Sequence, residues 1–380
     1  MRVGVCGLGG MGLLFTQLLH HHPDVAEIQV ADLKPEMRDF MSGTAIATRV
    51  LATFDELVDG DLDALVLFTP PWTHADMSVR ALEAGKHVLC ACPVGLSIDE
   101  LRRVIEAVER TGRIYMSAET SYYYLYAMFC RQAWQDGRFG DFVYAEGEYY
   151  HRPEAYEFWL RDGYATMPPV LYPTHSTTPT VSVLDRPWAR VTCIGTPGLR
   201  AEAAAYASRP EWQANDTVNM TMLGELQGGG VVRVNEMRNV GCKGELGSFF
   251  GTVGSIRMHS GGAVWTNGKI GPEQGGEDVL LHELWRDPQH HPQSALAGRL
   301  PDELRARWDE HPHHEHSHVF LVDEFVRSVV QDRRPHNNVW LAARSNAPGI
   351  TAWRSFQAGG AWTDVPDFGA PTDGRDPLPY

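Results

Sequence analysis

The feature that most constrains the fold is a glycine pattern near residue 1. Gly7-Leu8-Gly9-Gly10-Met11-Gly12 matches G-x-G-x-x-G, directly after an apolar run at Val3 to Cys6 and at the start of an expected helix, Met11 to His22. In such a motif the first glycine makes a tight turn, the second lets the backbone approach a pyrophosphate, and the third lets the helix pack on the strand. The helix N-terminus then offers free N–H groups to the phosphates. The pattern therefore predicts a dinucleotide site that includes Gly7, Gly9, Gly10, Met11 and Gly12.

An acidic residue follows the second expected strand. Glu27 to Ala31 is apolar enough for a buried strand, and Asp32 comes directly after it. A carboxylate at this place binds both ribose hydroxyls of the adenosine and repels a 2′-phosphate. Asp32 therefore favours NAD over NADP as the cofactor.

Strands and helices continue to alternate up to about residue 118. Two capping boxes, Thr53 with Glu56 and Ser97 with Glu100, open helices, and the second of these helices ends at Gly112. A further helix is expected over Thr73 to Ala84, with Gly85 at its C-terminal cap. The expected strands between the helices are Leu62 to Phe68, His87 to Cys90 and Arg113 to Ala118. This alternation predicts an α/β Rossmann domain with a parallel, doubly wound sheet.

After about Glu119 the pattern changes. We expect a helix over Tyr122 to Gln135, a strand over Phe142 to His151 and another over Val231 to Met237, with glycine-rich turns between later strands. These features predict an α+β domain with an open, mostly antiparallel sheet. We divide the chain into an NAD-binding domain, residues 1–120, and a substrate-binding and oligomerisation domain, residues 121–380. Residues 275–318 are expected to form a long ordered excursion, followed by a final helix over Phe320 to Asp332 and a Pro-rich tail.

Charge and composition limit the partners. The net charge of −15 argues against nucleic acid, although a few local Arg or Lys side chains still allow an anionic small substrate. No apolar run is long enough to span a membrane, and the N-terminus does not resemble a signal peptide. The six cysteines are scattered, which suits free thiols in a reducing compartment. We expect a cytoplasmic protein.

Two segments of the first domain resemble a known family. Thr69-Pro70-Pro71-Trp72-Thr73-His74 and Ala84-Gly85-Lys86-His87-Val88-Leu89-Cys90 are similar to the T-P-x-x-x-H and A-G-K-H-V-L motifs of the Gfo/Idh/MocA family. Phe249 to Ser255 resembles the family's G-T-x-G-S hairpin. The resemblance implies a Rossmann domain followed by an open sheet, and it adds the following residues to the expected cofactor contacts: Thr69, Pro70, Trp72, His74 and Glu119.

The sequence departs from the family's dehydrogenases at catalytic positions. Their Glu-Lys-Pro motif, whose lysine assists proton transfer, is replaced by Ala91-Cys92-Pro93. Cysteine cannot substitute for that lysine, because its side chain is shorter and its ionised form is negative. In the family's D-x-G-x-H motif, His175 is kept but the Asp and Gly positions hold Leu171 and Pro173.

A different branch of the family accounts for these departures. Leu171-Tyr172-Pro173-Thr174-His175 resembles the L-Y-P-T-H motif of its NAD-dependent glycosidases, which also lack the lysine. The resemblance implies hydrolysis without net oxidation: hydride removal from sugar C3, loss of the C2 proton, elimination, water addition and hydride return. Tyr172 and His175 would serve the C3 hydroxyl. Gly147-Glu148-Tyr149-Tyr150-His151 resembles a second motif of that branch, so Tyr149 or His151 would serve C2.

Alternatives remain at this level. A sugar or cyclitol dehydrogenase with a rebuilt proton relay would keep the same residues, and a non-catalytic NAD sensor would have lost activity with the lysine.

The Tyr122 to Tyr126 cluster is typical of helix packing. The run His311 to His318 favours a site-lining loop over zinc, and we expect no metal. Arg152, Arg161, Arg238 and Lys243 leave an acidic or sulfonated sugar open. The family fold also implies a homo-oligomer, a dimer or tetramer.

Overall fold

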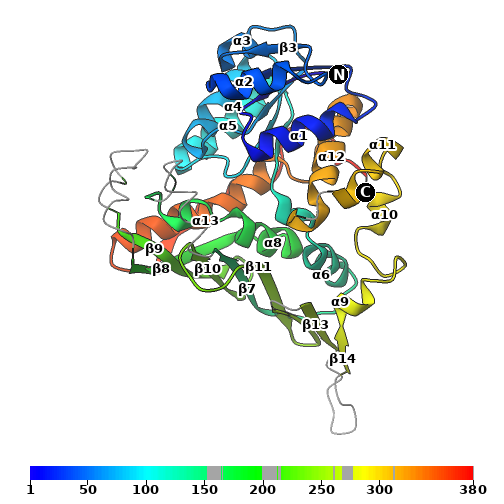
Figure 1. Ribbon diagram of the computed structural model, residues 1–380. Helices are drawn as coiled ribbons and strands as arrows, with labels where there is room; N and C mark the ends of the chain where they lie inside the picture. The colour runs from blue at the N-terminus through cyan, green and yellow to red at the C-terminus, as the bar shows by residue number, and fades with distance from the viewer. Residues whose placement is uncertain are drawn as a thin grey trace. The chain divides into compact units, whose positions relative to one another are not determined.

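The structure is a computed structural model with two compact units. It describes residues 1–151, 164, 166–198, 212, 215–259, 262–267, 277–310 and 313–379. One unit comprises Met1–Tyr124, Ala295–Ala343 and Phe368–Tyr380, and the other comprises Leu125–Ser294 and Arg344–Asp367. Each unit is described by itself below (Figure 1).

The first unit is built on a parallel sheet of six strands in the order β3-β2-β1-β4-β5-β6. All five strand pairs are parallel, and β1 runs between β2 and β4. The strands are β1 Arg2–Cys6, β2 Glu27–Ala31, β3 Arg49–Leu51, β4 Ala64–Leu67, β5 His87–Cys90 and β6 Tyr115–Ser117. The central strands β1 and β4 are buried and apolar, as their sequences predict, and the buried polar residues Gln29 and Ser117 lie on β2 and β6. The expected doubly wound Rossmann fold is confirmed.

Helices connect these strands, and two of them begin at the predicted caps. Thr53 and Glu56 form the reciprocal capping box of α3, and the Ser97 side chain accepts a hydrogen bond from the Glu100 N–H at the start of α5. The helices up to residue 124 are α1 Gly10–His20, α2 Pro35–Ser42, α3 Phe54–Val58, η1 Pro71–Thr73, α4 His74–Glu83, α5 Ile98–Thr111 and η2 Thr120–Tyr123. Later segments of the same unit are α10 Ser294–Ala297, α11 Asp302–Arg305, η6 Trp308–Glu310, η7 His313–His316 and α12 Ser317–Gln331.

The second unit contains a sheet of nine strands in the order β14-β13-β12-β11-β7-β10-β9-β8-β15. Only β7 and β10 pair in parallel among the described strands; the other pairs are antiparallel. The strands are β7 Phe142–Tyr150, β8 Trp188–Pro197, β9 Thr217–Leu226, β10 Val231–Met237, β11 Gly244–Gly251, β12 Gly254–His259, β13 Gly262–Asn267, β14 Glu277–Leu280 and β15 Thr363–Asp364. This arrangement confirms the predicted open, mostly antiparallel sheet, including the hairpin of β11 and β12.

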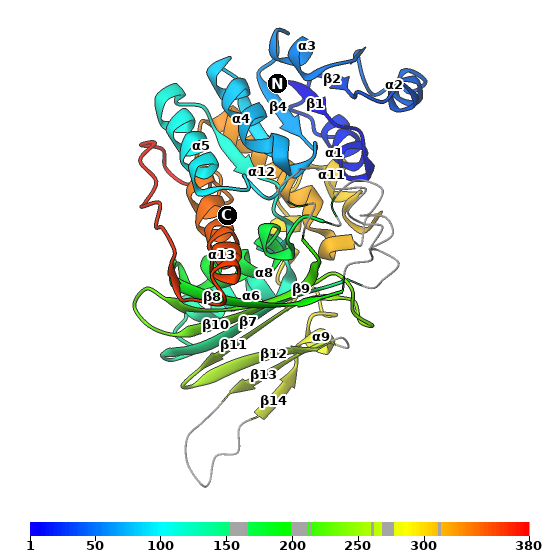
Figure 2. The same cartoon turned by 90° about the vertical axis from the view of Figure 1, so that its left-hand side faces the viewer.

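Helices cover one face of this sheet. Figures 1 and 2 show α6 Leu125–Gln135, α8 Thr174–Leu184 and α13 Val339–Gln357 on the same side of the strands. Alternate residues of the strands are buried beneath them, for example Val232, Val234 and Glu236 of β10. In the part of the chain that the structure describes, no helix lies on the opposite face of β7 to β10 (Figure 2).

Two sequence expectations need correction, and a third segment gains detail. The helix expected over Tyr122 to Gln135 is split into η2 and α6. The helix expected over Phe320 to Asp332 is α12, but it is not the last one: the expected tail contains α13, a helix of 19 residues. The excursion at 275–318 includes β14 and the short helices α9 Leu281–Leu284, α10 and α11. None of the helices among the described residues has the length and apolar character that a membrane crossing needs.

Candidate active site

The glycine motif forms the expected turn between β1 and α1. Gly7 has a φ of +90°, and a Cβ there would lie 2.4 Å from the carbonyl oxygen of Phe68. A Cβ on Gly12 would lie 1.9 Å from the Gly7 carbonyl oxygen, so only glycine lets the helix approach the turn this closely. A Cβ added to Gly9 or Gly10 would meet no neighbouring atom within 4 Å. Open space beside Gly9, at the N-terminus of α1, fits a bound pyrophosphate.

Asp32 follows β2 and faces the same turn. Its carboxylate accepts hydrogen bonds from the backbone N–H groups of Leu8, at 2.7 Å, and Lys34, at 2.8 Å. Each carboxylate oxygen keeps further lone pairs, so both remain able to accept a ribose hydroxyl. The residues of this turn therefore fit the adenosine and pyrophosphate part of NAD.

The loop after β4 is held by its own side chains. His74 is buried, and its ring nitrogens lie 2.8 Å from the Pro93 carbonyl oxygen and 2.7 Å from the Thr69 carbonyl oxygen. Burial lowers the pKa of His74. With both ring nitrogens within hydrogen-bond distance of backbone carbonyls, His74 supports the loop, and its contact with the cofactor stays a prediction. Trp72, in η1, and Pro70 are more exposed than His74.

Glu119 lies at the end of the parallel sheet, just beyond β6. It is buried, it caps η2 by accepting a hydrogen bond from the Ser121 N–H at 3.0 Å, and its carbonyl accepts one from the Asn337 side chain. Its place beyond the carboxyl end of a parallel strand is where ligands of doubly wound sheets bind.

The four candidate substrate residues form one aromatic cluster in the second unit. The Tyr149 ring lies between two histidines: its centroid is 4.3 Å from that of His151 and 5.2 Å from that of His175, with the latter pair stacked. Tyr172 completes the cluster, at 5.4 Å from His175 and 6.2 Å from Tyr149. The structure thus brings together two sequence motifs that are about 20 residues apart.

Local folding explains how Tyr172 and His175 come to face the sheet. The short helix η3 Pro169–Leu171 ends at Tyr172, and Pro173 allows α8 to begin at once, so His175 lies in the first turn of α8. This turn packs directly on β7, because Gly147 lacks a side chain: a Cβ there would lie 2.3 Å from the Ser176 carbonyl oxygen. The L-Y-P-T-H segment is therefore fixed against the strand that carries Tyr149.

Burial determines the charge of the cluster. It raises the pKa of Tyr149 well above that of a free tyrosine, so the phenol keeps its proton at neutral pH. It lowers the pKa of His151 to about 4, and the positive charges of Arg238 and Lys243 act in the same direction. His151 is therefore a neutral imidazole at neutral pH, with one nitrogen able to accept a proton.

Two charged residues, one in β10 and one directly after it, were not predicted as site residues. Glu236 is fully buried, and its Oε1 accepts a hydrogen bond from the Ser176 hydroxyl at 2.7 Å. Arg238, which the sequence suggested only as one of four basic residues, is 3% exposed and donates to the carbonyls of Tyr164 and Met167. The alternating pattern of the strand indicated that Glu236 faces the covered side, but its partner lies 60 residues away in sequence.

A cavity of about 80 Å³ opens beside the cluster. Its lining consists of Tyr149, Tyr164, Tyr172 and Arg238. This volume holds a few water molecules or one substituent of a larger ligand. Among the described residues the lining thus combines three tyrosine side chains with one guanidinium group. Of the other basic residues, Arg152 and Arg161 lie outside the described residues, as does His311 of the histidine run.

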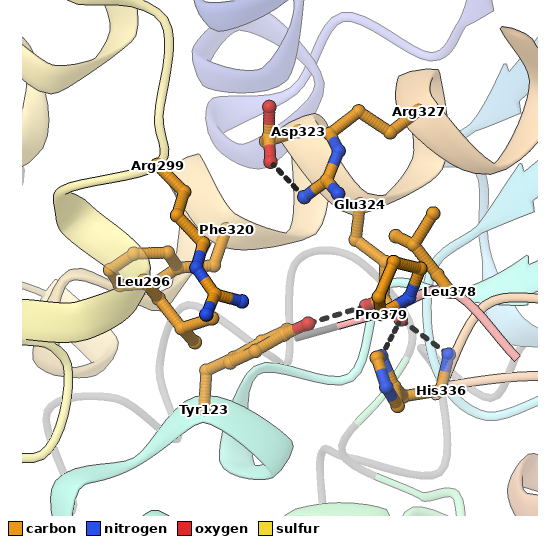
Figure 3. Close-up of a pocket in the computed structure, with 10 residues that line it drawn as sticks. All are labelled: Tyr123, Leu296, Arg299, Phe320, Asp323, Glu324, Arg327, His336, Leu378 and Pro379. Atoms are coloured by element: carbon orange, nitrogen blue, oxygen red, sulfur yellow. Dashed lines mark hydrogen bonds and ion pairs between the residues drawn. The ribbon is translucent and has the colours of Figure 1, made fainter. Parts of the chain in front are cut away.

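A second pocket, in the first unit, has a different character. Figure 3 shows Tyr123 and His336 directed at Glu324, and Arg327 at Asp323. The Tyr123 hydroxyl donates to Glu324 at 2.8 Å, and His336 lies 3.0 Å from the same carboxylate. The hydrogen bond from Tyr123 to Glu324 connects η2 to α12. We therefore assign the polar groups of this pocket a structural role. The tyrosines from 122 to 126 are all buried, as expected for packing residues.

Comparison with known proteins agrees with the Rossmann geometry. Residues 1–119 match the model of the GFO_IDH_MocA oxidoreductase family, described as having an NAD-binding Rossmann fold. The resemblance to the Gfo/Idh/MocA family is thus confirmed for this domain. The first domain is an NAD-binding domain.

Three individual proteins extend the likeness. A glycosyl hydrolase family 109 protein of Streptomyces niveus is 29% identical over 221 residues, which cover 52% of this chain and 45% of that protein. Another, from Solibacter usitatus, is 22% identical over 401 residues, covering 97% of this chain and 88% of that protein. Several such relatives are matched over only about half of their length or less. A levoglucosan dehydrogenase in complex with NADH and L-sorbose superimposes with a TM-score of 0.77 at 16% identity, covering 97% and 99% of the two chains, which shows a shared fold.

Proposed function

We propose that this chain is an NAD-dependent glycoside hydrolase that works without net oxidation of its substrate. The observation that carries the proposal is the cluster of Tyr172, His175, Tyr149 and His151 beside a cavity that Arg238 also lines. The replacement of the family's lysine by Cys92, which is buried, supports it, because the proton relay then has to come from other residues. Relatives named glycosyl hydrolase family 109 support it further.

In this proposal different side chains of the cluster carry out the proton transfers at C3 and at C2 of the sugar. NAD, when bound, supplies a reversible hydride acceptor for C3 of the sugar. Tyr172 and His175 hold the C3 hydroxyl and take its proton. Oxidation at C3 acidifies the C2 proton, and His151 is the more suitable base for it, since its imidazole is neutral whereas Tyr149 retains its own proton. Loss of the C1 substituent, addition of water and return of the hydride complete a cycle that consumes only water.

The cavity bears on the class of sugar. Arg238 contributes a buried positive charge next to the tyrosine hydroxyl groups of the cavity. A buried guanidinium favours a carboxylate or sulfonate group on the ligand. We therefore extend the proposal to glycosides of acidic or sulfonated sugars.

The test follows both products of the reaction. The purified protein is incubated with aryl glycosides in D₂O, while aglycone release and NADH absorbance are recorded together. Release without net NADH, with solvent deuterium at C2 of the sugar, is the expected result. Tyr172→Phe should lower kcat at least 100-fold, because the phenol that assists C3 deprotonation is lost, on the scale of about 10²–10⁴ for such groups. An unchanged kcat would remove Tyr172 from the mechanism.

A second candidate function is supported by the solved structures. Levoglucosan dehydrogenase, with a closely similar fold, oxidises its substrate as its name states. If this chain is a sugar or cyclitol dehydrogenase, the same incubation with free sugars yields one NADH per sugar oxidised and no aglycone.

A further inference from the structure

Arg38, in α2, lies next to the residue whose carboxylate is expected to bind the adenosine ribose. Its Nη1 donates hydrogen bonds to the backbone carbonyl oxygens of Asp32 and Leu33, both at 2.8 Å. These two residues directly follow β2. The guanidinium group is therefore held at the carboxyl end of the parallel sheet, the edge at which doubly wound folds bind nucleotides.

The other nitrogens of this guanidinium group have no partner in the part of the chain that the structure describes. Nη1 makes both hydrogen bonds, and neither Nη2 nor Nε donates to a described residue. Glu36 and Asp39 are close to Arg38 in sequence, but neither forms an ion pair with it, because residues one or two apart on a helix do not face each other. The edge formed by Nη2 and Nε, with three N–H groups, is left for solvent or a ligand.

Asp32 and Arg38 present opposite charges beside the same expected ribose. The Asp32 carboxylate accepts hydrogen bonds from the N–H groups of Leu8 and Lys34, and it forms no ion pair with Arg38. In dinucleotide-binding folds a carboxylate at this place accepts the ribose hydroxyls of NAD, whereas a nearby arginine accommodates the 2′-phosphate of NADP. This chain carries both groups. The exposed side chain of Lys34, at the start of α2, adds a second cation.

We propose that Arg38 is a specificity-determining residue that lets the dinucleotide site accept NADP as well as NAD. The edge formed by Nη2 and Nε binds the 2′-phosphate, and Asp32 weakens this binding without abolishing it. Two adjacent donors of a planar guanidinium group match the geometry of a phosphate, and hydrogen bonds between charged groups are stronger than neutral ones. The inference concerns the cofactor and goes beyond the proposed function, since it rests on the NAD-binding domain alone.

Calorimetric titration of the full chain with NAD and with NADP tests this role. For the natural chain the Kd for NADP should lie within roughly 100-fold of the Kd for NAD, because the attraction by Arg38 offsets part of the repulsion by Asp32. Arg38→Ala should raise the Kd for NADP at least roughly tenfold more than the Kd for NAD, because charged hydrogen bonds to the phosphate are lost. Arg110→Ala is the matched control. It removes an arginine that pairs with Glu83 at the C-terminal ends of α4 and α5, and should leave the ratio of the two Kd values unchanged.

A second variant changes the opposing charge. Asp32→Asn keeps an oxygen that can accept the Leu8 N–H but carries no charge, so the Kd for NADP should fall roughly tenfold relative to the Kd for NAD. Adding Arg38→Ala to Asp32→Asn should again raise the Kd for NADP at least roughly tenfold relative to NAD, since the phosphate contact is then lost. This pair of variants measures the contribution of Arg38 where NADP binds more tightly.

Two results would overturn the proposal. One is an equal change of both Kd values on Arg38→Ala, in either background, as expected if Arg38 only holds the segment after β2 or stacks on the adenine ring. The other is a Kd for NADP that exceeds the Kd for NAD by more than about 100-fold in the natural chain. The titrations contain no sugar, so failure to hydrolyse glycosides leaves their outcome unaffected, and successful hydrolysis does not decide it.

Discussion

At the scale of single residues, the glycines of the nucleotide motif differ in what surrounds them. A Cβ on Gly12 would collide with the Gly7 carbonyl, whereas a Cβ on Gly9 would meet no protein atom within 4 Å. The first position is therefore constrained by packing of the protein, and the second by the approach of a ligand. The different roles that the motif predicts for the two glycines can therefore be tested separately.

This difference predicts opposite phenotypes. Gly12→Ala should lower the free energy of unfolding of the cofactor-free protein by about 1–3 kcal/mol or more, because α1 must move off the turn. Gly9→Ala should leave that stability nearly unchanged and weaken NAD binding at least tenfold, because the methyl group occupies the space of the pyrophosphate. Urea unfolding and calorimetric NAD titration measure the two effects. Equal losses of stability in both variants would contradict the assignment.

Glu236 also affects how stability depends on pH. Between about pH 4.5 and pH 8 the carboxyl is ionised in the unfolded chain but protonated in the folded one. The unfolded state then binds fewer protons, so this group lowers the free energy of unfolding as the pH rises through that window, by at most about 1.4 kcal/mol per unit. Glu236→Gln removes this contribution. The stability difference between variant and natural chain should therefore grow from pH 5 to pH 8 in urea unfolding; a difference independent of pH would refute it.

At the scale of elements, the sequence was informative where local signals and periodicity agreed. The strands Glu27–Ala31 and His87–Cys90 were predicted to the residue, and both capping boxes mark real helix starts. Helix α13 was missed because Pro348 and Gly349 lie inside it, and both residues normally interrupt helices. The pairing of Glu236 with Ser176 was also beyond prediction, since no local pattern specifies which helix turn packs on a strand.

The unexpected glycine of α13 has a packing role that can be tested. A Cβ on Gly349 would lie 2.0 Å from the Val170 carbonyl oxygen and 2.5 Å from Pro173, at the turn that carries Tyr172. Gly349→Ala should therefore displace this turn, lower kcat at least tenfold and reduce stability by about 1–3 kcal/mol. Arg354→Ala, an exposed position on the same helix, is the control and should change neither quantity appreciably. Full activity in Gly349→Ala would show that the turn tolerates the displacement.

At the scale of the whole molecule, the large sheet presents one face without a helix over β7 to β10 in the described residues (Figure 2). Apolar side chains on this face are exposed, among them Ile194, 68%, and Leu223, 38%. Beside them, on the neighbouring strands β10 and β7, Arg233 lies 2.9 Å from both Glu146 and Glu148. A surface that combines apolar groups with ordered polar groups is typical of a protein interface.

We therefore expect a homo-oligomer that buries this face against a second copy, as a dimer or tetramer. Ile194→Glu places a charge on this face, so that an isologous contact would bury two such charges in one interface. Light scattering after size-exclusion chromatography should show a mass nearer to the 42.4 kDa of one chain for this variant than for the natural protein. Val253→Glu, 41% exposed in the turn between β11 and β12, introduces the same charge away from the face and should leave the mass unchanged. A natural protein that elutes as a monomer at every concentration would show that this face is used for another purpose.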